Sequence, residues 1–250
     1  MLTRRPTGQA PMATDLSQVK ALTFDVFGTV VDWRTSIIRD LEGFGKKKGI
    51  TADWAELTDE WRGAYRPTLN KVIKGEIPFA RLDDLHRGVL DGLLEKFGVK
   101  GLSEADKDHV NKVWHRLQGW PDTVPGLTRL KKKFLITTLS NGNVALLTNM
   151  AKFAGLPWDC VLSAELFRHY KRDPEVYMGA CDMLCLPRDQ VMMVAAHKDD
   201  LAAARTQGMK TAYVDRPGEY GPRPTPHPKV EHEPDVAAKD FVELAAKLGV

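Results

Sequence analysis

Short apolar runs with strand character recur along the chain and alternate with helical patterns in its second half. The strand-like runs are residues 21–25, 134–139, 160–163, 191–195 and 211–214. Helical stripes separate the last four runs, as in Val144, Leu147, Met150 and Ala154. This alternation predicts a parallel sheet whose strands are joined by crossover helices.

A long helical segment interrupts this pattern between the first two strand-like runs. Its apolar stripes are Ile37, Leu41 and Phe44; Leu57, Trp61 and Tyr65; Leu85, Val89 and Phe97; and Val110, Val113, Trp114 and Leu117. Ser103 and Asp106 have the spacing of a capping box at the start of the fourth stripe. The stripes predict a four-helix cap domain, residues 35–118, inserted into an α/β core, residues 19–34 and 119–250. The cleft between the two is the expected site.

The two ends of the chain have separate patterns. Residues 1–18 predict a flexible N-terminal arm, and Val242, Ala245 and Leu248 predict a last helix with these residues toward the sheet. Residues 215–235 contain six of the fifteen prolines, which excludes regular structure. We interpret this proline-rich segment as a surface loop, with a flap over the site or a subunit contact as alternatives.

Composition narrows the class of protein. The chain has 250 residues, is 43% hydrophobic and has a formal charge of +3, so it can bury a substantial core and carries no strong electrostatic signal for nucleic acid. We interpret the lysine runs 46–48 and 131–133 as solvent-exposed faces of helices. No apolar stretch is long enough for a membrane helix and the first residues lack a signal-peptide pattern, so we expect a cytoplasmic protein. The three cysteines lack the spacing of a zinc site, and we expect no metal or other cofactor.

Polar residues follow the strand-like runs at four places. The first has Asp25 and Thr29, and the second has Ser140 and Asn141. The third is residues 170–177 and the fourth is residues 194–201. Because the carboxyl ends of parallel strands meet at one edge of a sheet, these groups are expected to lie together.

Three of these places carry sequence motifs that are jointly specific for a protein family: FD-x-FGT-x-x-D from Phe24, LSNG from Leu139 and YK-x-D-x-x-VY from Tyr170. Together they resemble the type II (S)-2-haloacid dehalogenase branch of the haloacid dehalogenase superfamily, which has a Rossmann-like core and a helical cap. The resemblance implies that Asp25 displaces halide from C2 of a short 2-haloacid. Water then hydrolyses the resulting aspartyl ester to a 2-hydroxy acid. It also implies a homodimer whose ligands are a halocarboxylate and a halide ion.

The resemblance assigns roles residue by residue. Catalytic roles are expected for Asp25, Lys171, Arg62, Asp200, Ser140 and Thr29, and substrate contacts for Asn141, Tyr177, Phe27, Trp61, Phe79 and Val26. His197 departs from the family pattern and is a further catalytic candidate because it lies at the edge of the expected site. Lys171 is expected to keep Asp25 ionised, with Asp200 orienting the lysine or the water. Hydroxyl groups of Ser140 and Thr29 can donate to carboxylates. Arg62, which directly follows a tryptophan, is the expected halide acceptor, with Arg66 one helical turn on as its substitute.

Packing roles compete with several of these assignments. Trp61 and Phe79 fit the walls of a halide pocket and equally the interior of the cap, and Tyr177 fits an apolar helix stripe. The sequence Ala195-Ala196-His197 departs from the family, whose familiar members have serines and an asparagine there. His197 can replace them by positioning water or acting as a base, although a structural histidine is the common case.

Two other functions stay open at this point. A phosphatase of the same superfamily would form an aspartyl phosphate on Asp25, with magnesium held by acids such as Asp199 and Asp200. Phe27 argues against it, because phosphate chemistry needs an acid there to protonate the leaving oxygen. A non-catalytic module that binds small carboxylates or a partner protein is the second alternative, and the retained polar residues argue against it.

Overall fold

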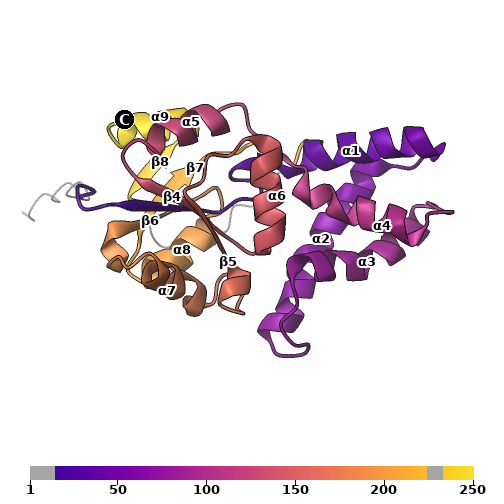
Figure 1. Cartoon of the computed structure of the whole chain (residues 1–250), viewed down its shortest axis with the longest axis horizontal. Helices are drawn as coiled ribbons and strands as arrows, with labels where there is room; N and C mark the ends of the chain where they lie inside the picture. Colours follow the sequence, from indigo (N-terminus) through magenta and orange to yellow (C-terminus); the bar gives the residue numbers. More distant parts are fainter. Residues whose placement is uncertain (1–14, 224–232) are drawn as a thin grey trace, which may run out of the picture.

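A computed structural model describes residues 15–223 and 233–250 of the chain. Its centre is a parallel sheet with the strand order β5-β4-β1-β6-β7-β8 (Figure 1). The strands of this sheet are β1 (Ala21–Phe24), β4 (Leu135–Ser140), β5 (Cys160–Ser163), β6 (Val191–Ala195), β7 (Lys210–Val214) and β8 (Val236–Ala238). β1 lies between β4 and β6, and the sequence predicted every strand except β8. The predicted α/β fold with a Rossmann-like core is confirmed.

Helices cover both faces of the sheet. The helices of the core are α5 (Thr123–Leu130), α6 (Val144–Ala154), α7 (Pro174–Met183), α8 (Lys198–Thr206) and α9 (Phe241–Lys247), with short 3-10 turns η2 (Ala164–Leu166) and η3 (Arg188–Gln190). α5 and α9 lie on one face, whereas α7 and α8 lie on the other (Figure 1). These helices return the chain so that β1, β4 and β6 end at the same edge.

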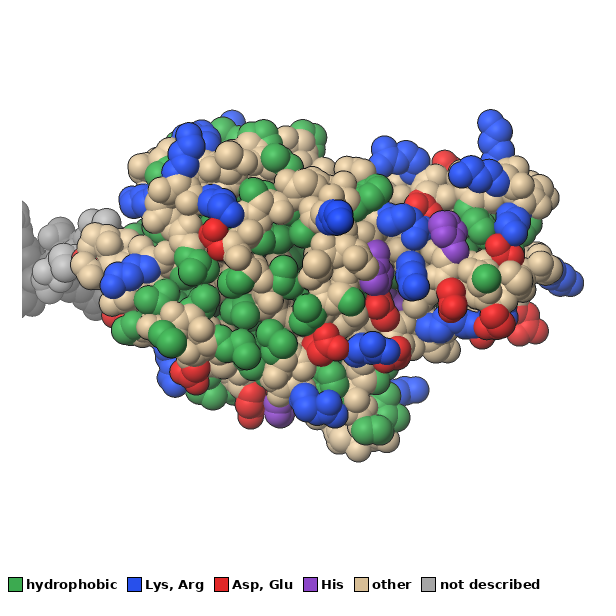
Figure 2. Space-filling model, in the orientation of Figure 1, with side chains coloured by type: hydrophobic (Ala, Val, Ile, Leu, Met, Phe, Trp, Pro, Cys, Tyr) green, Lys and Arg blue, Asp and Glu red, His purple; other side chains and the backbone are tan. Residues whose placement is uncertain are grey.

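A second group of helices lies beyond that edge, to the right in Figure 1. It consists of α1 (Trp33–Lys48), α2 (Trp54–Ile73), α3 (Leu82–Lys96), α4 (Glu104–Asn111) and the 3-10 turn η1 (Lys112–His115). The capping box of Ser103 and Asp106 is present at the start of α4. In the view of Figure 2, charged side chains gather over this group, whereas hydrophobic side chains gather over the core.

A two-stranded ribbon connects the helical group to the core. β2 (Val31–Asp32) pairs antiparallel with β3 (Gln118–Gly119), so the chain leaves and re-enters the core at one point. The Asp32 side chain also accepts a hydrogen bond of 3.0 Å from the Thr35 backbone and caps α1. We propose that this ribbon is the boundary between the core and a cap domain.

The prediction for the last helix is wrong at Val242, which is 37% exposed. The helix begins at Phe241, after Asp240 caps its first turn. Its buried stripe is Phe241, Leu244, Ala245 and Leu248, the i, i+3, i+4, i+7 pattern of one helix face. Val242 lies one position beside this stripe and therefore faces solvent.

Parts of two predictions lie outside the described residues: the N-terminal arm at residues 1–14 and the proline-rich segment at residues 224–232. Within the described ranges, no helix combines the length and the apolarity that crossing a membrane requires.

Candidate active site

A cavity of about 650 Å³ lies at the carboxyl edge of the sheet and extends to helix α2. It is lined by Asp25, Phe27, Trp33, Asp59, Arg62, Gly63, Tyr65, Arg66, Ser140, Asn141, Lys171, Arg172, His197, Asp199, Tyr220 and Arg223. The lining therefore combines residues from all four polar places of the sequence with residues from α2 and the proline-rich segment.

Asp25 directly follows β1 and is 7% exposed. Its Oδ1 atom accepts a hydrogen bond of 2.9 Å from Nζ of Lys171, and its Oδ2 atom accepts one of 2.8 Å from the Thr29 hydroxyl. His197 Nδ1 lies 2.8 Å from the same Oδ2 atom. Burial alone would raise the pKa of Asp25, but the charges and hydrogen bonds of Lys171 and His197 hold it well below its usual range. Asp25 is therefore an ionised carboxylate.

Lys171 joins Asp25 to a second buried acid. Its Nζ atom donates at 2.5 Å to Asp200 Oδ2, and Asp200 Oδ1 accepts at 2.5 Å from the Tyr177 hydroxyl. Burial disfavours the charged amine, but Asp200 and Asp25 raise the pKa of Lys171 above its usual value. The amine therefore stays protonated and acts as a fixed positive charge.

His197 lies between two carboxylates. On one side it contacts Asp25, and on the other its Nε2 atom lies 3.0 Å from Glu219 Oε2. Burial would lower the pKa of His197, but the hydrogen bonds to Asp25 and Glu219 raise it to about 10. The ring is therefore a protonated imidazolium at neutral pH, and its two N–H groups donate to the two acids.

Glu219 comes from the proline-rich segment, and the sequence analysis did not select it. Its side chain is 1% exposed and accepts a hydrogen bond of 3.2 Å from Trp33 Nε1. Gly28 leaves room for it, because a Cβ atom at Gly28 would lie 2.2 Å from Glu219 Oε1. The surface-loop interpretation is wrong for the described residues before 224, since Glu219 is buried against His197 and Tyr220 lines the cavity. A flap over the site describes them better.

Arg216 anchors this segment to the core. Its guanidinium binds both carboxylate oxygens of Asp122, at 2.7 and 2.8 Å. It also donates at 2.8 Å to the backbone oxygen of Thr29, four residues after Asp25. A bidentate arginine is a rigid connection, and it fixes the segment to the turn that follows the buried acid. No sequence signal distinguished this arginine from others in polar loops.

Arg62 reaches the cavity from helix α2. Its guanidinium lies 4.6 Å from the ring centre of Tyr65 and 5.3 Å from that of Trp33, and 3.9 Å from Glu219 Oε1. Asn141 is fixed nearby, because its side-chain amide donates at 2.9 Å to the Tyr65 hydroxyl. The guanidinium of Arg62, the side-chain amide of Asn141 and the hydroxyl of Tyr65 therefore lie around one part of the cavity.

Ser140 and Phe27 also line the cavity as expected, whereas several other predicted site residues do not. Ser140 Oγ accepts a bond of 3.3 Å from the Gly142 backbone, which leaves its hydroxyl hydrogen available to donate. Thr29, Asp200 and Tyr177 lie behind the cavity wall and act on it through Asp25 and Lys171. Val26 is absent from the lining because its side chain is fully buried.

The predicted pocket walls Trp61 and Phe79 lie elsewhere. Trp61 is fully buried among the cap helices, and its Nε1 atom donates at 3.2 Å to the backbone oxygen of His86. Consecutive helical residues point in different directions, so Arg62 faces the cavity while Trp61 faces the helix interior. Phe79 stacks on Tyr170 at 5.2 Å and lines a separate hollow of about 310 Å³. These two assignments as pocket walls are wrong for this arrangement.

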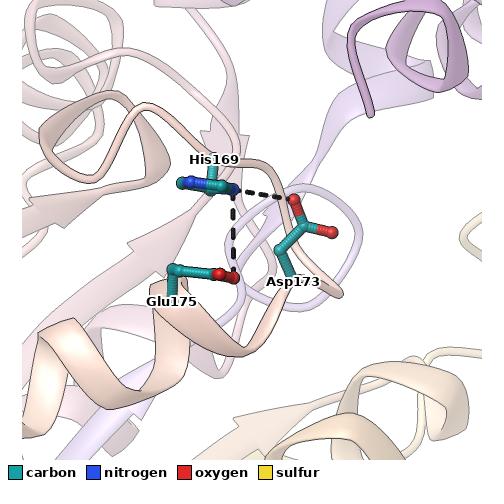
Figure 3. Close-up of side chains that lie close together, drawn as sticks. All are labelled: His169, Asp173 and Glu175. Carbon is teal, nitrogen blue, oxygen red and sulfur yellow. Dashed lines mark hydrogen bonds and ion pairs between the residues drawn. The ribbon is translucent and has the colours of Figure 1, made fainter. Parts of the chain in front are cut away.

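A further group of potential ligands lies outside the cavity lining. His169, Asp173 and Glu175 point toward one another before and within the first turn of α7 (Figure 3). His169 Nδ1 lies 3.0 Å from Asp173 and 3.9 Å from Glu175, and all three side chains are partly or largely solvated. A solvated ion pair accounts for this contact, and we assign no ion to it.

The fold and the site define an α/β protein with a Rossmann-like core, whose cavity centres on a buried, ionised aspartate. A family model described as haloacid dehalogenase-like hydrolase matches residues 19–208, and the chain belongs to this family. The resemblance recognised in the sequence is therefore confirmed.

Individual relatives are similar over nearly the whole chain. (S)-2-haloacid dehalogenase 1 of Pseudomonas sp. (strain CBS-3) is 29% identical over 85% of this chain and 92% of its own length. The crystal structure of an L-2-haloacid dehalogenase is 46% identical with a TM-score of 0.88, over 92% of this chain and 98% of its own. That of a defluorinating L-2-haloacid dehalogenase is 40% identical with a TM-score of 0.89, over 93% and 96%.

Proposed function

We propose that this protein hydrolyses short 2-haloacids to 2-hydroxy acids through an ester formed on Asp25. The observation that carries the proposal is a buried carboxylate kept ionised by Lys171 and His197 at the centre of the cavity. An ionised carboxylate is a nucleophile toward carbon, and its removal from water strengthens its interactions with a bound substrate. The names of the similar proteins support the same reaction.

In the first step, an oxygen of Asp25 forms a bond to C2 as the carbon–halogen bond breaks and the halide takes the electron pair. Among the described residues, Oδ2 accepts hydrogen bonds from Thr29 and His197, whereas Oδ1 accepts from Lys171. Oδ1 therefore keeps the more available lone pair, which supports it as the attacking atom.

The leaving halide and the substrate carboxylate both need donors. Arg62 supplies a positive charge that is mostly shielded from solvent, and its contacts with Tyr65 and Trp33 fix it. Its carboxylate contact among the described residues, with Glu219, is long at 3.9 Å. We assign the halide to Arg62 and the free N–H of Asn141. The Ser140 hydroxyl is suited to the substrate carboxylate.

Ester hydrolysis uses His197 and Glu219. Ester formation removes the charge of Asp25, so the pKa of His197 falls and its proton leaves to solvent. The neutral ring then accepts a proton from water as the water oxygen attacks Cγ of Asp25, while Glu219 holds the ring and stabilises the imidazolium that forms. The bond between Cγ and the alkoxide oxygen then breaks, and the alkoxide takes the second proton of the attacking water from the new Asp25 carboxyl group. The 2-hydroxy acid leaves, and the Asp25 carboxylate and the protonated His197 are restored.

The contacts of the acids argue against the phosphatase alternative. Asp199 accepts hydrogen bonds from Arg172 at 2.5 and 3.2 Å, and Asp200 is held by Lys171 and Tyr177. Carboxylates neutralised by cationic side chains are poor ligands for magnesium, which also prefers near-octahedral oxygen coordination. Phe27 lines the cavity where the phosphatase reaction needs a proton donor.

The test is halide release from chloroacetate, compared with phosphate release from p-nitrophenyl phosphate with and without EDTA. We expect halide release that EDTA does not change, and its loss in Asp25→Asn but not in the exposed control Asp182→Asn. Successive turnovers in water labelled with heavy oxygen should place the label in Asp25. Label found in the product alone, or turnover by Asp25→Asn, would refute the ester route.

The homodimer and the cytoplasmic location stay predictions from the sequence. Light scattering coupled to size exclusion measures the first, and cell fractionation measures the second. A monomer at micromolar concentration would contradict the dimer.

A further inference from the structure

The cavity is much larger than the short acids of the proposed reaction require. At about 30 Å³ per water-sized unit, a five-atom acid such as chloroacetate takes up on the order of 150 Å³. The cavity has about 650 Å³, within the range of pockets that hold larger ligands. The residues around Asp25 that bind a short acid therefore use only one part of the cavity. The residues that line the rest of the cavity determine which larger ligands can bind.

That remaining part is lined by three arginines and by the carboxylates of Asp59 and Asp199. Besides Arg62 and Lys171, the cavity lining includes Arg66, Arg172 and Arg223. Arg172 is held by Asp199 at 2.5 Å, and Arg223 is held by Glu56 at 2.5 Å and by Asp59 at 3.3 Å. These two arginines are already paired with carboxylates.

Arg66 differs from them. Within the described ranges, its carboxylate neighbour is Asp199, at 3.6 Å, and Asp199 is already bonded to Arg172. The Arg66 side chain is 44% exposed, so its guanidinium can rotate toward the cavity. It lies one turn beyond Arg62 on α2, about 6 Å along the helix axis. A second anionic group of a ligand held near Asp25 therefore has an unsatisfied bidentate donor within reach.

We propose that Arg66 is a specificity-determining residue that binds a second carboxylate, so that the enzyme accepts 2-halo dicarboxylic acids. The inference rests on the proposed dehalogenation and extends it to a substrate class. The halogen-bearing end lies at Asp25 and Arg62, and the distal carboxylate replaces the long contact between Arg66 and Asp199. An arginine-lined cavity also attracts a doubly charged acid more strongly than a singly charged one.

The experiment compares diacids with monoacids of equal carbon number: 2-chlorosuccinate with 2-chlorobutanoate, 2-chloroglutarate with 2-chloropentanoate, and 2-chloroadipate with 2-chlorohexanoate. Halide release gives kcat/KM for each, and the ratio within a pair isolates the second carboxylate. The variants are Arg66→Gln, Arg66→Lys and the control Arg39→Gln, which changes an exposed arginine on α1 that does not line the cavity.

We expect a ratio above one for at least one pair in the unmodified protein. Arg66→Gln should lower this ratio of kcat/KM by about tenfold or more, because a hydrogen bond between charged groups contributes about that much to binding. Arg66→Lys should recover part of it, and Arg39→Gln should leave it unchanged. A ratio below one for every pair, or an equal ratio in Arg66→Gln, would overturn the proposal. Absence of halide release from every diacid and monoacid tested, chloroacetate included, would instead refute the proposed dehalogenation itself.

Discussion

Nδ1 of His197 lies 2.8 Å from Oδ2 of Asp25, although the two residues are 172 positions apart in the sequence. Their charges depend on each other: the Asp25 carboxylate, together with that of Glu219, raises the pKa of the imidazole to about 10, and the imidazolium helps to hold the Asp25 carboxylate ionised. A reaction that neutralises Asp25 therefore changes the protonation of His197. This link gives the histidine different roles in the two steps of the proposed reaction.

Replacing His197 with asparagine should separate those steps. Asparagine keeps an N–H donor toward Asp25 but cannot accept a proton from water, so ester formation continues while hydrolysis slows by about 10²- to 10⁴-fold. We expect one equivalent of halide per protein in a burst, and a mass increase on the peptide that contains Asp25. Steady turnover without a burst would contradict the assigned role.

Replacing Lys171 with methionine should leave Asp25 and Asp200 close together without their shared cation. The pKa of Asp25 then rises, because burial and the nearby carboxylate both disfavour its charge. Halide release at pH 7 should fall by about 100-fold or more and partly recover as the pH increases. The measurement is a pH–rate profile beside Lys171→Arg, which keeps the charge. A flat profile at the original rate would show that the lysine does not control ionisation.

A side chain at Gly28 should disturb both folding and catalysis. Gly28 has a φ angle of +85°, and an added Cβ atom would lie 2.2 Å from Glu219 Oε1. Gly28→Ala should therefore lower the free energy of unfolding by about 1–2 kcal/mol and displace Glu219 from His197. Gly43→Ala is the matched control, because nothing lies within 4 Å of the added atom. It should raise stability by about 0.5–1 kcal/mol and leave the rate unchanged.

The buried His86 should make the protein sensitive to acid. It stacks on Trp114 at 4.3 Å, and neither ring nitrogen has a hydrogen-bond partner among the described residues. Burial lowers its pKa to about 3, below the value of about 6.5 in the unfolded chain. The unfolded state therefore binds more protons between these values, and stability falls as the pH decreases from 6.5 toward 3.

At pH 5 this difference amounts to about 2 kcal/mol. His86→Leu should therefore lose less stability than the unmodified protein when urea unfolding is compared at pH 7.5 and pH 5. An equal loss in both proteins would show that His86 titrates normally in the fold.

Some of the site could be predicted because it follows strand ends. Asp25 directly follows β1, Ser140 is the last residue of β4 and His197 comes two residues after β6, and parallel strands place such residues at one edge. Residues on α2 were harder to assign. Trp61 and Arg62 are neighbours in the sequence, but the rotation of the helix sends one into the interior and the other into the cavity.

The sequence by itself determined the α/β core, the helical insertion and the acid at the end of the first strand, because these depend on local periodicity and on the order of strands. The tertiary structure alone decided that Glu219 lies against His197 and that Arg66 lines the cavity, 3.6 Å from a carboxylate that Arg172 already binds. Such contacts join segments far apart in the chain, and their geometry depends on how the proline-rich segment and α2 pack over the sheet. No local pattern encodes that packing.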